Sequence, residues 1–319
     1  MIATTAAGSA YRSLFQDVHD VAIVGGGYAA LAAAQALAGQ GRAVLVIDRQ
    51  AALAWESGWA MSQEVGSSSD PTWAGWLKGL EQRGAARAGM IDGAVAEIIA
   101  HETMRRAGVR VLAYAAGMAV ERSGDMISAL IVGTKSGLRR VVARQWIDAS
   151  ETGELLALVD PGWRPPAPAE RAVTLYLRHA EALLPESVPV DCPALPRAEL
   201  TWRPTLWRNE SSLSIVLRDQ TRDARSAWVP ALAALRTSQP AAMARAVLTH
   251  GSVLTFPRYA AAEARDAGIG NLTIAVPGLA SGACATIAHR YLTGVAAAAA
   301  LSSSRRCDPP ADAFTRPIG

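Results

Sequence analysis

Apolar residues near the start of the chain fall into two short runs separated by one long run of small residues. Residues 21–24 and 43–47 are short and continuously apolar, and residues 28–38 between them are rich in Ala and Leu. Short apolar runs next to glycines favour buried strands, whereas the longer run favours a helix. The pattern predicts a strand–turn–helix–strand unit over residues 20–49.

The next part of the chain predicts one helix followed by a series of strands. Residues 92–107 carry apolar side chains at helical spacing and end at Gly108, after which residues 109–114 predict a strand. Short polar turns separate alternating runs, which predicts an antiparallel three-stranded meander. The runs of this meander cover residues 118–122, 126–133 and 138–143, and a further strand is predicted over residues 145–148.

The second half of the chain changes character after a proline-rich break at residues 161–168. Strand-like runs and a helical pattern over residues 223–248, interrupted by Pro240, predict a smaller α+β domain inserted over residues 161–269. A strand over residues 271–276 and a helix over 286–301, almost all of small residues, then return to the first domain, and the helix must pack closely against a flat neighbour. The predicted domains are 1–160 with 270–305, and 161–269, followed by a surface tail at 306–319.

The first turn has the spacing of a dinucleotide-binding motif. Gly25 permits a sharp turn out of the strand, and Gly27 lets the backbone approach a pyrophosphate. Ala30 supplies the small residue that close packing of helix on strand requires, and the helix directs its free N–H groups towards the phosphates. Asp48, 23 residues after Gly25, stands where a carboxylate accepts hydrogen bonds from ribose hydroxyls. The alternative is a glycine-rich turn that binds nothing.

Composition narrows the classes of protein that fit. The chain has 319 residues, half of them hydrophobic, and a net charge of only +3 with dispersed Lys and Arg, which argues against a nucleic-acid surface. No apolar run is long enough to span a membrane, and the N-terminus is not a convincing signal peptide. The three cysteines form no paired framework, which favours the cytoplasm, and the five histidines have no metal-ligand spacing, so no metal site is predicted.

These pieces together resemble the FAD-dependent oxidoreductases of the glutathione-reductase-type superfamily. Within it, the chain looks most like a bacterial group whose middle motif reads roughly IDATGDGDLA, which is matched here by IDASETGELL at residues 147–156. The order of elements is also similar, from the N-terminal glycine unit to the small-residue helix at the end. The resemblance covers residues 20–160 and 270–302 and implies an α/β, Rossmann-like FAD-binding domain with a β-meander and an inserted substrate domain.

The resemblance also implies a set of FAD-contacting residues. The first turn and helix would hold the pyrophosphate, Asp48 and Arg49 the adenosine, the meander the adenine edge, and the C-terminal turn the ribityl chain and flavin. Ser57 and Gly58 stand in for the glycine doublet of the family. The implied residues are Gly25, Gly26, Gly27, Ala29, Ala30, Asp48, Arg49, Ser57, Gly58, Gly117, Ala149, Gly153, Pro277 and Gly278.

No catalytic residue can be assigned from the sequence. His289 and Cys284 lie close to the predicted flavin helix, but each is better explained as a structural or surface residue. Four tryptophans at 55, 59, 73 and 76 could line a flat ring, although core packing is the better explanation. Single arginines such as Arg203 and Arg258 could bind a substrate carboxylate, although each alone fits a surface position.

The sequence therefore predicts an FAD-dependent oxidoreductase that acts on a small organic substrate, with oxidase, dehydrogenase and monooxygenase chemistry all open. A second nucleotide motif is missing, so a separate NAD(P)H domain is not expected. The alternative is an auxiliary flavin-fold subunit with reduced catalysis in a hetero-complex. An electron-exchanging protein partner and a homo-oligomer also stay open.

Overall fold

The computed structural model describes residue 11 and residues 13–179, 186–219, 223–263 and 267–303. The predicted tail at 306–319 and Cys307 lie outside these described residues.

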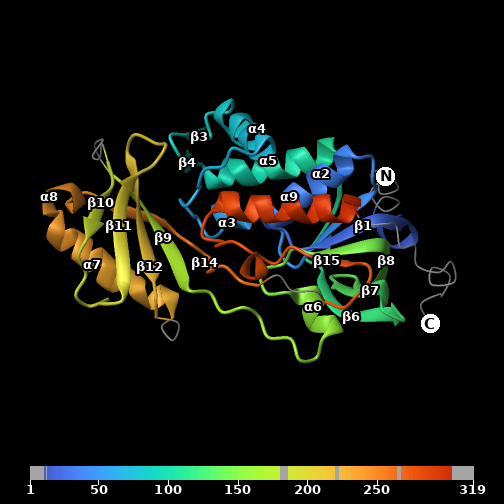
Figure 1. The fold of residues 1–319 in the computed structure, drawn as a ribbon. Coiled ribbons are helices and arrows are strands. Elements are labelled where there is room, and N and C mark those ends of the chain that lie inside the picture. The colour runs from blue at the N-terminus through green and yellow to red at the C-terminus, as the bar shows by residue number, and fades with distance from the viewer. Residues whose placement is uncertain (1–10, 12, 180–185, 220–222, 264–266, 304–319) are drawn as a thin grey trace.

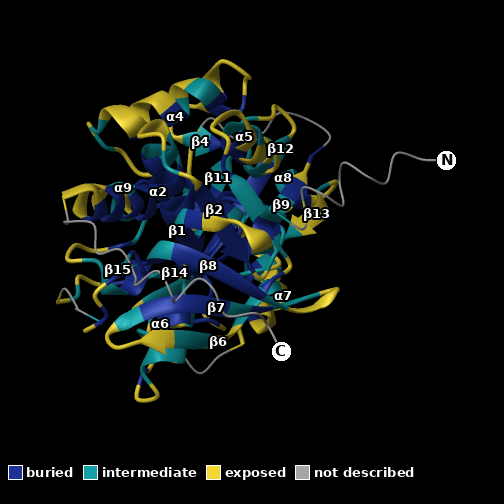
Figure 2. Ribbon diagram, turned by 90° about the vertical axis from the view of Figure 1, so that its right-hand side faces the viewer, coloured by how far each residue is buried: buried dark blue, intermediate teal, exposed yellow. Residues whose placement is uncertain are grey.

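A parallel sheet forms the centre of the molecule. Its strands run in the order β5 (Arg110–Ala113), β2 (Val44–Asp48), β1 (Val18–Val24) and β8 (Gly137–Asp148), and β15 (Leu272–Ile274) pairs with β8. Every neighbour in this group is parallel. The buried strands at the centre of Figure 2 are the continuous apolar runs that the sequence predicts for a sheet covered on both faces. The α/β, Rossmann-like fold class is confirmed.

The predicted meander is joined directly to the parallel sheet. Strands β6 (Ala116–Ser123) and β7 (Met126–Thr134) pair antiparallel, and β7 pairs with the first half of β8. The second half of β8 pairs with β1. The separate strand predicted at residues 145–148 is therefore wrong, because β8 runs without a break through both sheets.

Helices cover the two faces of the parallel sheet unequally. On one face lie α2 (Tyr28–Gly39), α5 (Gly93–Arg106) and α9 (Ile287–Ser303), and on the other lies α6 (Glu154–Val159) (Figure 1). The predicted close packing of the small-residue helix is confirmed, because a Cβ at Gly294 of α9 would collide with the backbone of Ala29 in α2.

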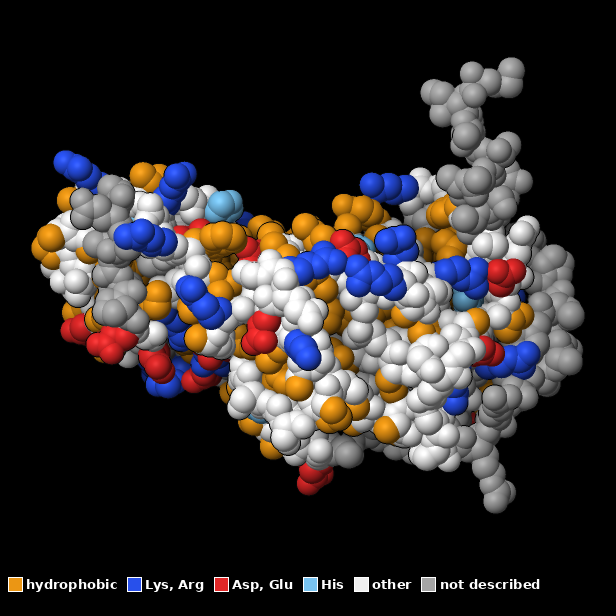
Figure 3. Space-filling model, turned by 90° about the horizontal axis from the view of Figure 1, so that it is seen from above, with side chains coloured by type: hydrophobic (Ala, Val, Ile, Leu, Met, Phe, Trp, Pro, Cys, Tyr) orange, Lys and Arg blue, Asp and Glu red, His pale blue; other side chains and the backbone are white. Residues whose placement is uncertain are grey.

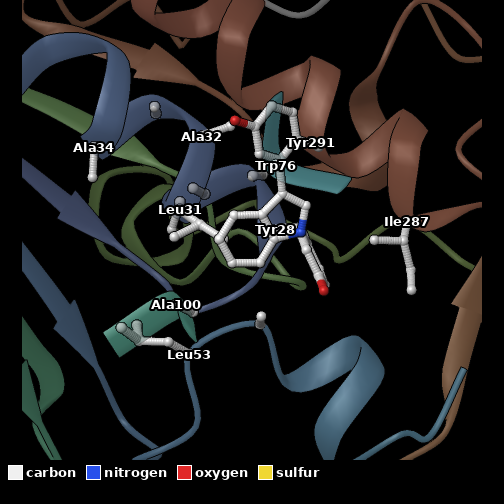
Figure 4. Close-up of a cluster of buried hydrophobic side chains, with 14 of the residues drawn as sticks. Tyr28, Leu31, Ala32, Ala34, Leu53, Trp76, Ala100, Ile287 and Tyr291 are labelled. Atoms are coloured by element: carbon white, nitrogen blue, oxygen red, sulfur yellow. The ribbon is translucent and has the colours of Figure 1, made fainter. Parts of the chain in front are cut away.

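A cluster of aromatic and small side chains fills the space between these helices (Figure 4). The ring of Tyr28 lies edge-on to Trp73 and Trp76 of α4 (Pro71–Glu81), at centroid distances of 6.4 and 6.0 Å. Trp73 also lies 5.4 Å from the ring of Tyr291 in α9. Two of the four tryptophans thus serve core packing.

The second half of the chain builds an antiparallel sheet beside the first. Its order is β10–β11–β12–β9–β13, with β14 also paired to β9, and α7 and α8 pack beside it (Figure 1). An apolar cluster of its own lies between this sheet and α7. The bounds are β9 (Glu170–Arg178), β10 (Val188–Val190), β11 (Ala198–Pro204), β12 (Glu210–Leu217), α7 (Trp228–Ser238), α8 (Pro240–Met243), β13 (Val247–Gly251) and β14 (Phe256–Arg258).

Short elements make up the connections. They are α3 (Trp55–Gly58), β3 (Ala86–Arg87), β4 (Met90–Ile91) and the two 3-10 turns η1 (Ala224–Ala227) and η2 (Pro277–Leu279). Of the helices described, none is both long and apolar enough to cross a membrane. Lys and Arg side chains are interspersed with other types over the face seen in Figure 3.

Candidate functional site

A groove of about 330 Å³ lies at the carboxyl ends of β1, β2 and β8. This edge is where open parallel sheets bind ligands, because the loops that follow neighbouring strands diverge there. Residues 166–168 and 254–259, which flank the second sheet, close the opposite side. The wall consists of Gly25, Gly26, Asp48, Arg49, Gln50, Trp55, Ala149, Ser150, Glu151, Thr152, Glu154, Pro166, Pro168, Leu254, Thr255, Pro257 and Tyr259.

Two glycines keep the floor of the groove free of side chains. Gly25 has a φ of +119°, and a Cβ on it would lie 2.5 Å from the carbonyl oxygen of Ala149. A Cβ on Gly26 would lie 2.6 Å from Oδ2 of Asp48. Any other residue at these positions would force the loops after β1, β2 and β8 apart, so the sharp turn predicted at Gly25 is present for a steric reason.

Asp48, in the wall of this groove, has one buried carboxylate oxygen without a hydrogen-bond partner among the described residues. Its side chain is buried, and Oδ2 has no hydrogen-bond partner in the described residues. Burial, and then the neighbouring charge of Glu154, raise the pKa of Asp48 to about 6. A buried acceptor without a donor is unfavourable, so this oxygen is suited to the hydroxyl groups of a ligand.

The loop after β8 is held in place by the buried side chain of Asp148. One carboxylate oxygen accepts hydrogen bonds from the N–H and hydroxyl of Ser150, and the other accepts from the N–H groups of Leu155 and Leu156 at the start of α6. Burial raises the pKa of Asp148 to about 6. The hydrogen bonds from these donors act in the opposite direction, because they favour the charged form. Asp148 thereby fixes Ala149 against Gly25.

The N-terminus of α2, where the sequence predicts free N–H groups, already carries an anion. The N–H of Tyr28 donates to both carboxylate oxygens of Glu56, at 3.0 and 3.2 Å. Glu56 is 1% exposed, and a Cβ on Gly27 would lie 2.5 Å from its Oε1. Burial raises the pKa of Glu56 to about 7, and the charge of Arg290 acts in the opposite direction.

Arg290 of α9 balances this buried charge. Its guanidinium pairs with Glu151 and lies 3.7 Å from Glu56, and it donates to the carbonyl oxygen of Pro257 at 2.7 Å. It also lies over the ring of Phe256, 4.7 Å from the centroid. The side chain is fully buried, and its acidic neighbours raise the pKa of Arg290, although burial acts the other way. Removing one partner of a charge pair at such depth is strongly destabilising, because the other charge stays buried without a partner.

The structure brings together only part of the predicted site. Gly25, Gly26, Asp48, Arg49 and Ala149 line the groove. Arg49 also pairs with Glu154 at 3.2 Å on the rim. The remaining predicted residues lie elsewhere.

Some of these remaining residues support the groove from behind, and others lie further away. Ala29 and Ala30 are buried in α2, and Gly153 packs against Trp163. Gly117 faces Leu158 of α6, and Gly278 packs against Pro166. Ser57 and Gly58 line a second cavity of about 250 Å³ between α3 and the second sheet, together with Tyr176, Trp207 and His250.

The other candidate side chains are accounted for by structural contacts. His289 is exposed on α9, and Cys284 is buried, which raises the pKa of its thiol to about 11. Arg203 and Arg258 both pair with Glu64. The described residues contain no grouping of His, Cys, Asp or Glu that could hold a metal ion.

Sequence reasoning missed the charged residues Glu56, Glu151 and Arg290. The only signal for them is an arginine within a helix rich in small residues, since an arginine that such a helix buries needs an acidic partner. Nothing in the sequence indicates which acid that partner is.

The first half of the chain matches a known protein family. The model of the family described as FAD dependent oxidoreductase matches residues 20–179. No curated protein sequence matches the chain.

Solved structures share the fold at low sequence identity. A geranylgeranyl bacteriochlorophyll reductase-like protein from Thermoplasma acidophilum superposes with a TM-score of 0.63 at 13% identity, covering 89% of this chain and 78% of the other. Glycine oxidase from Bacillus cereus gives 0.62 at 12% identity, covering 90% and 96%. The flavin-dependent brominase Bmp2 gives 0.63 at 11% identity, covering 91% and 81%.

Proposed function

The chain belongs to the family of FAD-dependent oxidoreductases, and we propose that the groove at the carboxyl ends of β1, β2 and β8 holds its FAD. The observation that carries this proposal is the unpartnered Oδ2 of Asp48 in the wall of the groove. An adenosine ribose placed there would supply the missing donors. The glycine floor beside it leaves room for a backbone-lined pyrophosphate site.

The finer assignment to the glutathione-reductase-type superfamily is supported by the middle motif. Asp148 of this motif caps α6 and orders Ser150, so the loop stays close to Gly25 despite its unusual Ser-Glu pair. The same hydrogen bonds keep the backbone of Ala149 close to Gly25, and both residues line the groove. The predicted contacts of Gly117, Gly153, Pro277 and Gly278 with FAD remain part of this proposal.

The second sheet provides the substrate side. Its flanking residues 254–259 close the groove, and its strands contribute Tyr176 and His250 to the second cavity next to Ser57. We therefore place a small organic substrate between the two sheets, which corresponds to the predicted division at residues 161–269. Bound FAD supplies the hydride or electron transfer, and the protein residues bind and orient the reactants and exclude water. Cys192 and Cys284, the cysteines within the described residues, are both free, which favours a reducing compartment such as the cytoplasm.

A specific observation also favours the alternative of an auxiliary subunit with reduced catalysis. The position of the pyrophosphate at the N-terminus of α2 is taken by Glu56, which Arg290 holds in turn. If this arrangement never opens, FAD has no complete site, and the chain would act through a partner protein. The two functions differ in a simple property, the ability of the purified protein to bind FAD.

The test is an absorbance spectrum of the purified protein with added FAD, compared with the variants Asp48→Asn and Asp17→Asn. Asp17 is the matched control, because it lies before the opposite end of β1 in an exposed pair with Arg110. We expect D48N to weaken FAD binding about tenfold or more, the effect of losing charge-assisted hydrogen bonds, and D17N to bind as the unmodified protein does. Flavin bands that bleach with NADH or NADPH would support a nicotinamide-fed enzyme. A protein that takes up no FAD would instead support the auxiliary role.

A further inference from the structure

We propose that residues 54–61, here named the α3 segment, form a built-in latch that must be displaced for FAD to bind. In this inference, which rests on the proposed FAD groove, the carboxylate of Glu56 takes the place of the pyrophosphate at the N-terminus of α2. FAD loading is then an exchange of one anion for another.

The first support is the contact itself. Both oxygens of Glu56 accept from the N–H of Tyr28, the first residue of α2, and they lie where the missing side chain of Gly27 would be. A helix N-terminus binds one anion through these N–H groups and the positive end of its dipole. A pyrophosphate and the carboxylate of Glu56 cannot occupy this position together, because their charges repel and their atoms would overlap.

The second support is the backbone at both ends of the latch. Ala54 has a φ of 55° and Met61 a φ of 50°, and neither is a glycine. The left-handed conformation is unfavourable for residues with a Cβ and persists only where surrounding contacts impose it. Strain at both ends of the α3 segment lowers the free energy needed to move it as one piece.

The third support is that Arg290 stays balanced when Glu56 leaves. Arg290 keeps its ion pair with Glu151 and its hydrogen bond to the carbonyl oxygen of Pro257. A pyrophosphate arriving at the N-terminus of α2 would restore the negative charge that Glu56 removes. The exchange therefore leaves no buried cation without a partner.

The α3 segment also contacts the far wall of the groove. The carbonyl oxygen of Trp59 accepts hydrogen bonds from the N–H groups of Val253 and Leu254, at 2.9 and 3.2 Å. Leu254 and Trp55 both line the groove. Displacement of the α3 segment therefore moves the wall at Trp55 and, through Trp59, the wall at Leu254. FAD binding would in this way alter the side of the groove that faces the second sheet.

The experiment measures the Kd for FAD by quenching of flavin fluorescence at pH 8, in the unmodified protein and in the variants Glu56→Gln and Glu102→Gln. This pH lies above the pKa of Glu56, which is about 7, and the carboxylate faces Tyr28, Arg290 and Glu151. Glu102 is the matched control, because its substitution removes the same charge from ion pairs with Arg83 and Arg106, at the far end of α5 and outside the groove. We expect E56Q to bind FAD about tenfold more tightly than the unmodified protein and E102Q to change the Kd less than threefold, since tenfold corresponds to about one charge-assisted hydrogen bond.

The outcomes separate the latch from the proposed function. If neither the unmodified protein nor either variant binds FAD, the proposed function is wrong. If the unmodified protein binds FAD and E56Q binds it equally or more weakly, the latch is wrong.

A second measurement needs no variant and covers the case in which E56Q does not fold. Amide hydrogen exchange of residues 54–61 should change when FAD is added to the unmodified protein. Exchange of α7, residues 228–238, should not, because that helix packs in the second apolar core and contributes no residue to the groove. Bound FAD with unchanged exchange in residues 54–61 would also overturn the latch.

Discussion

Glu56, Glu151 and Arg290 form a charged group that is buried where the fold calls for a ligand. Removing such charges from water is unfavourable, and the attraction between them offsets this only when the geometry is good. Here the N–H of Tyr28 and the carbonyl oxygen of Pro257 supply further partners, although Nε of Arg290 has none among the described residues. Removing one member of the charged group would leave another buried charge without its partner.

The first prediction is a change in the pH dependence of stability. The pKa of Glu56 is raised from 4.5 to about 7, so folding favours its protonated form. Its contribution to stability is present below about pH 4.5 and is lost as the pH rises through about 7. Between pH 5 and pH 8 the free energy of unfolding should therefore fall less in the Glu56→Gln variant than in the unmodified protein. The difference between the two falls should be up to about 3 kcal/mol.

Urea denaturation followed by circular dichroism, without FAD, measures this difference. Asp48 and Asp148 also have raised pKa values, both about 6, but they titrate in both proteins and cancel from the comparison. If the free energy of unfolding changed with pH in the same way in both proteins, Glu56 would not titrate in this range.

At the scale of elements, the contact between α2 and α9 fixes the position of the first turn of α2. A Cβ on Gly294 would collide with the carbonyl oxygen of Ala29, in the first turn of α2. The two helices approach this closely only because the residues between them are small. The contact holds the N-terminus of α2 at the groove.

The second prediction is that Gly294→Ala destabilises the protein. We expect a loss of about 1–3 kcal/mol, the usual effect of overpacking, together with weaker FAD binding as α2 shifts. The control is Gly79→Ala in α4, where a Cβ would meet no atom within 4 Å. That change should instead stabilise by about 0.5–1 kcal/mol, because alanine is the better helix former. Thermal unfolding of both variants checks the opposite signs.

Most elements could be predicted from sequence because their signals are local. The glycine turn, the strands around it and the small-residue helix each follow from residues that are adjacent in the chain. The continuity of β8 could not, because a strand that passes from a meander to a parallel sheet shows no turn and no change of residue type. Of the predicted site residues, Gly25, Gly26, Asp48, Arg49 and Ala149 line the groove, and each belongs to a local motif. The burial of Glu56 depends on Arg290, which lies far away in the sequence, and no local pattern indicates that pair.

At the scale of the molecule, one apolar cluster is confined to the second sheet and α7, whereas Ala172, Val216 and Phe256 of that sheet belong to the cluster of the parallel sheet. The cluster beneath the second sheet includes Leu213, Ile215 and Trp202, and it contains no residue that lines the groove. The groove depends on the other clusters, which lie around the parallel sheet. Stability of the second sheet and FAD binding should therefore respond to different substitutions.

The third prediction tests this separation with Leu213→Ala. The side chain is fully buried in β12, so its truncation should reduce the free energy of unfolding by about 2–5 kcal/mol. The Kd for FAD should stay within about twofold of the unmodified value at a temperature where the variant is folded. Calorimetry and flavin titration measure the two quantities. A parallel loss of FAD affinity would mean that the second core does support the groove.

The pairing of β1 with β8, and of β8 with β15, also determines when the molecule can fold as it is synthesised. The strand β1 and the helix α2 are made early, yet α9, which packs on α2, lies at residues 287–303, and β15, which pairs with β8 beside β1, lies at residues 272–274. Contacts so distant in sequence form slowly, and domains that depend on them expose apolar surface in the meantime. The face of α2 that packs on α9 therefore stays uncovered until α9 has been synthesised. We expect nascent chains that stop before α9 to be retained by chaperones.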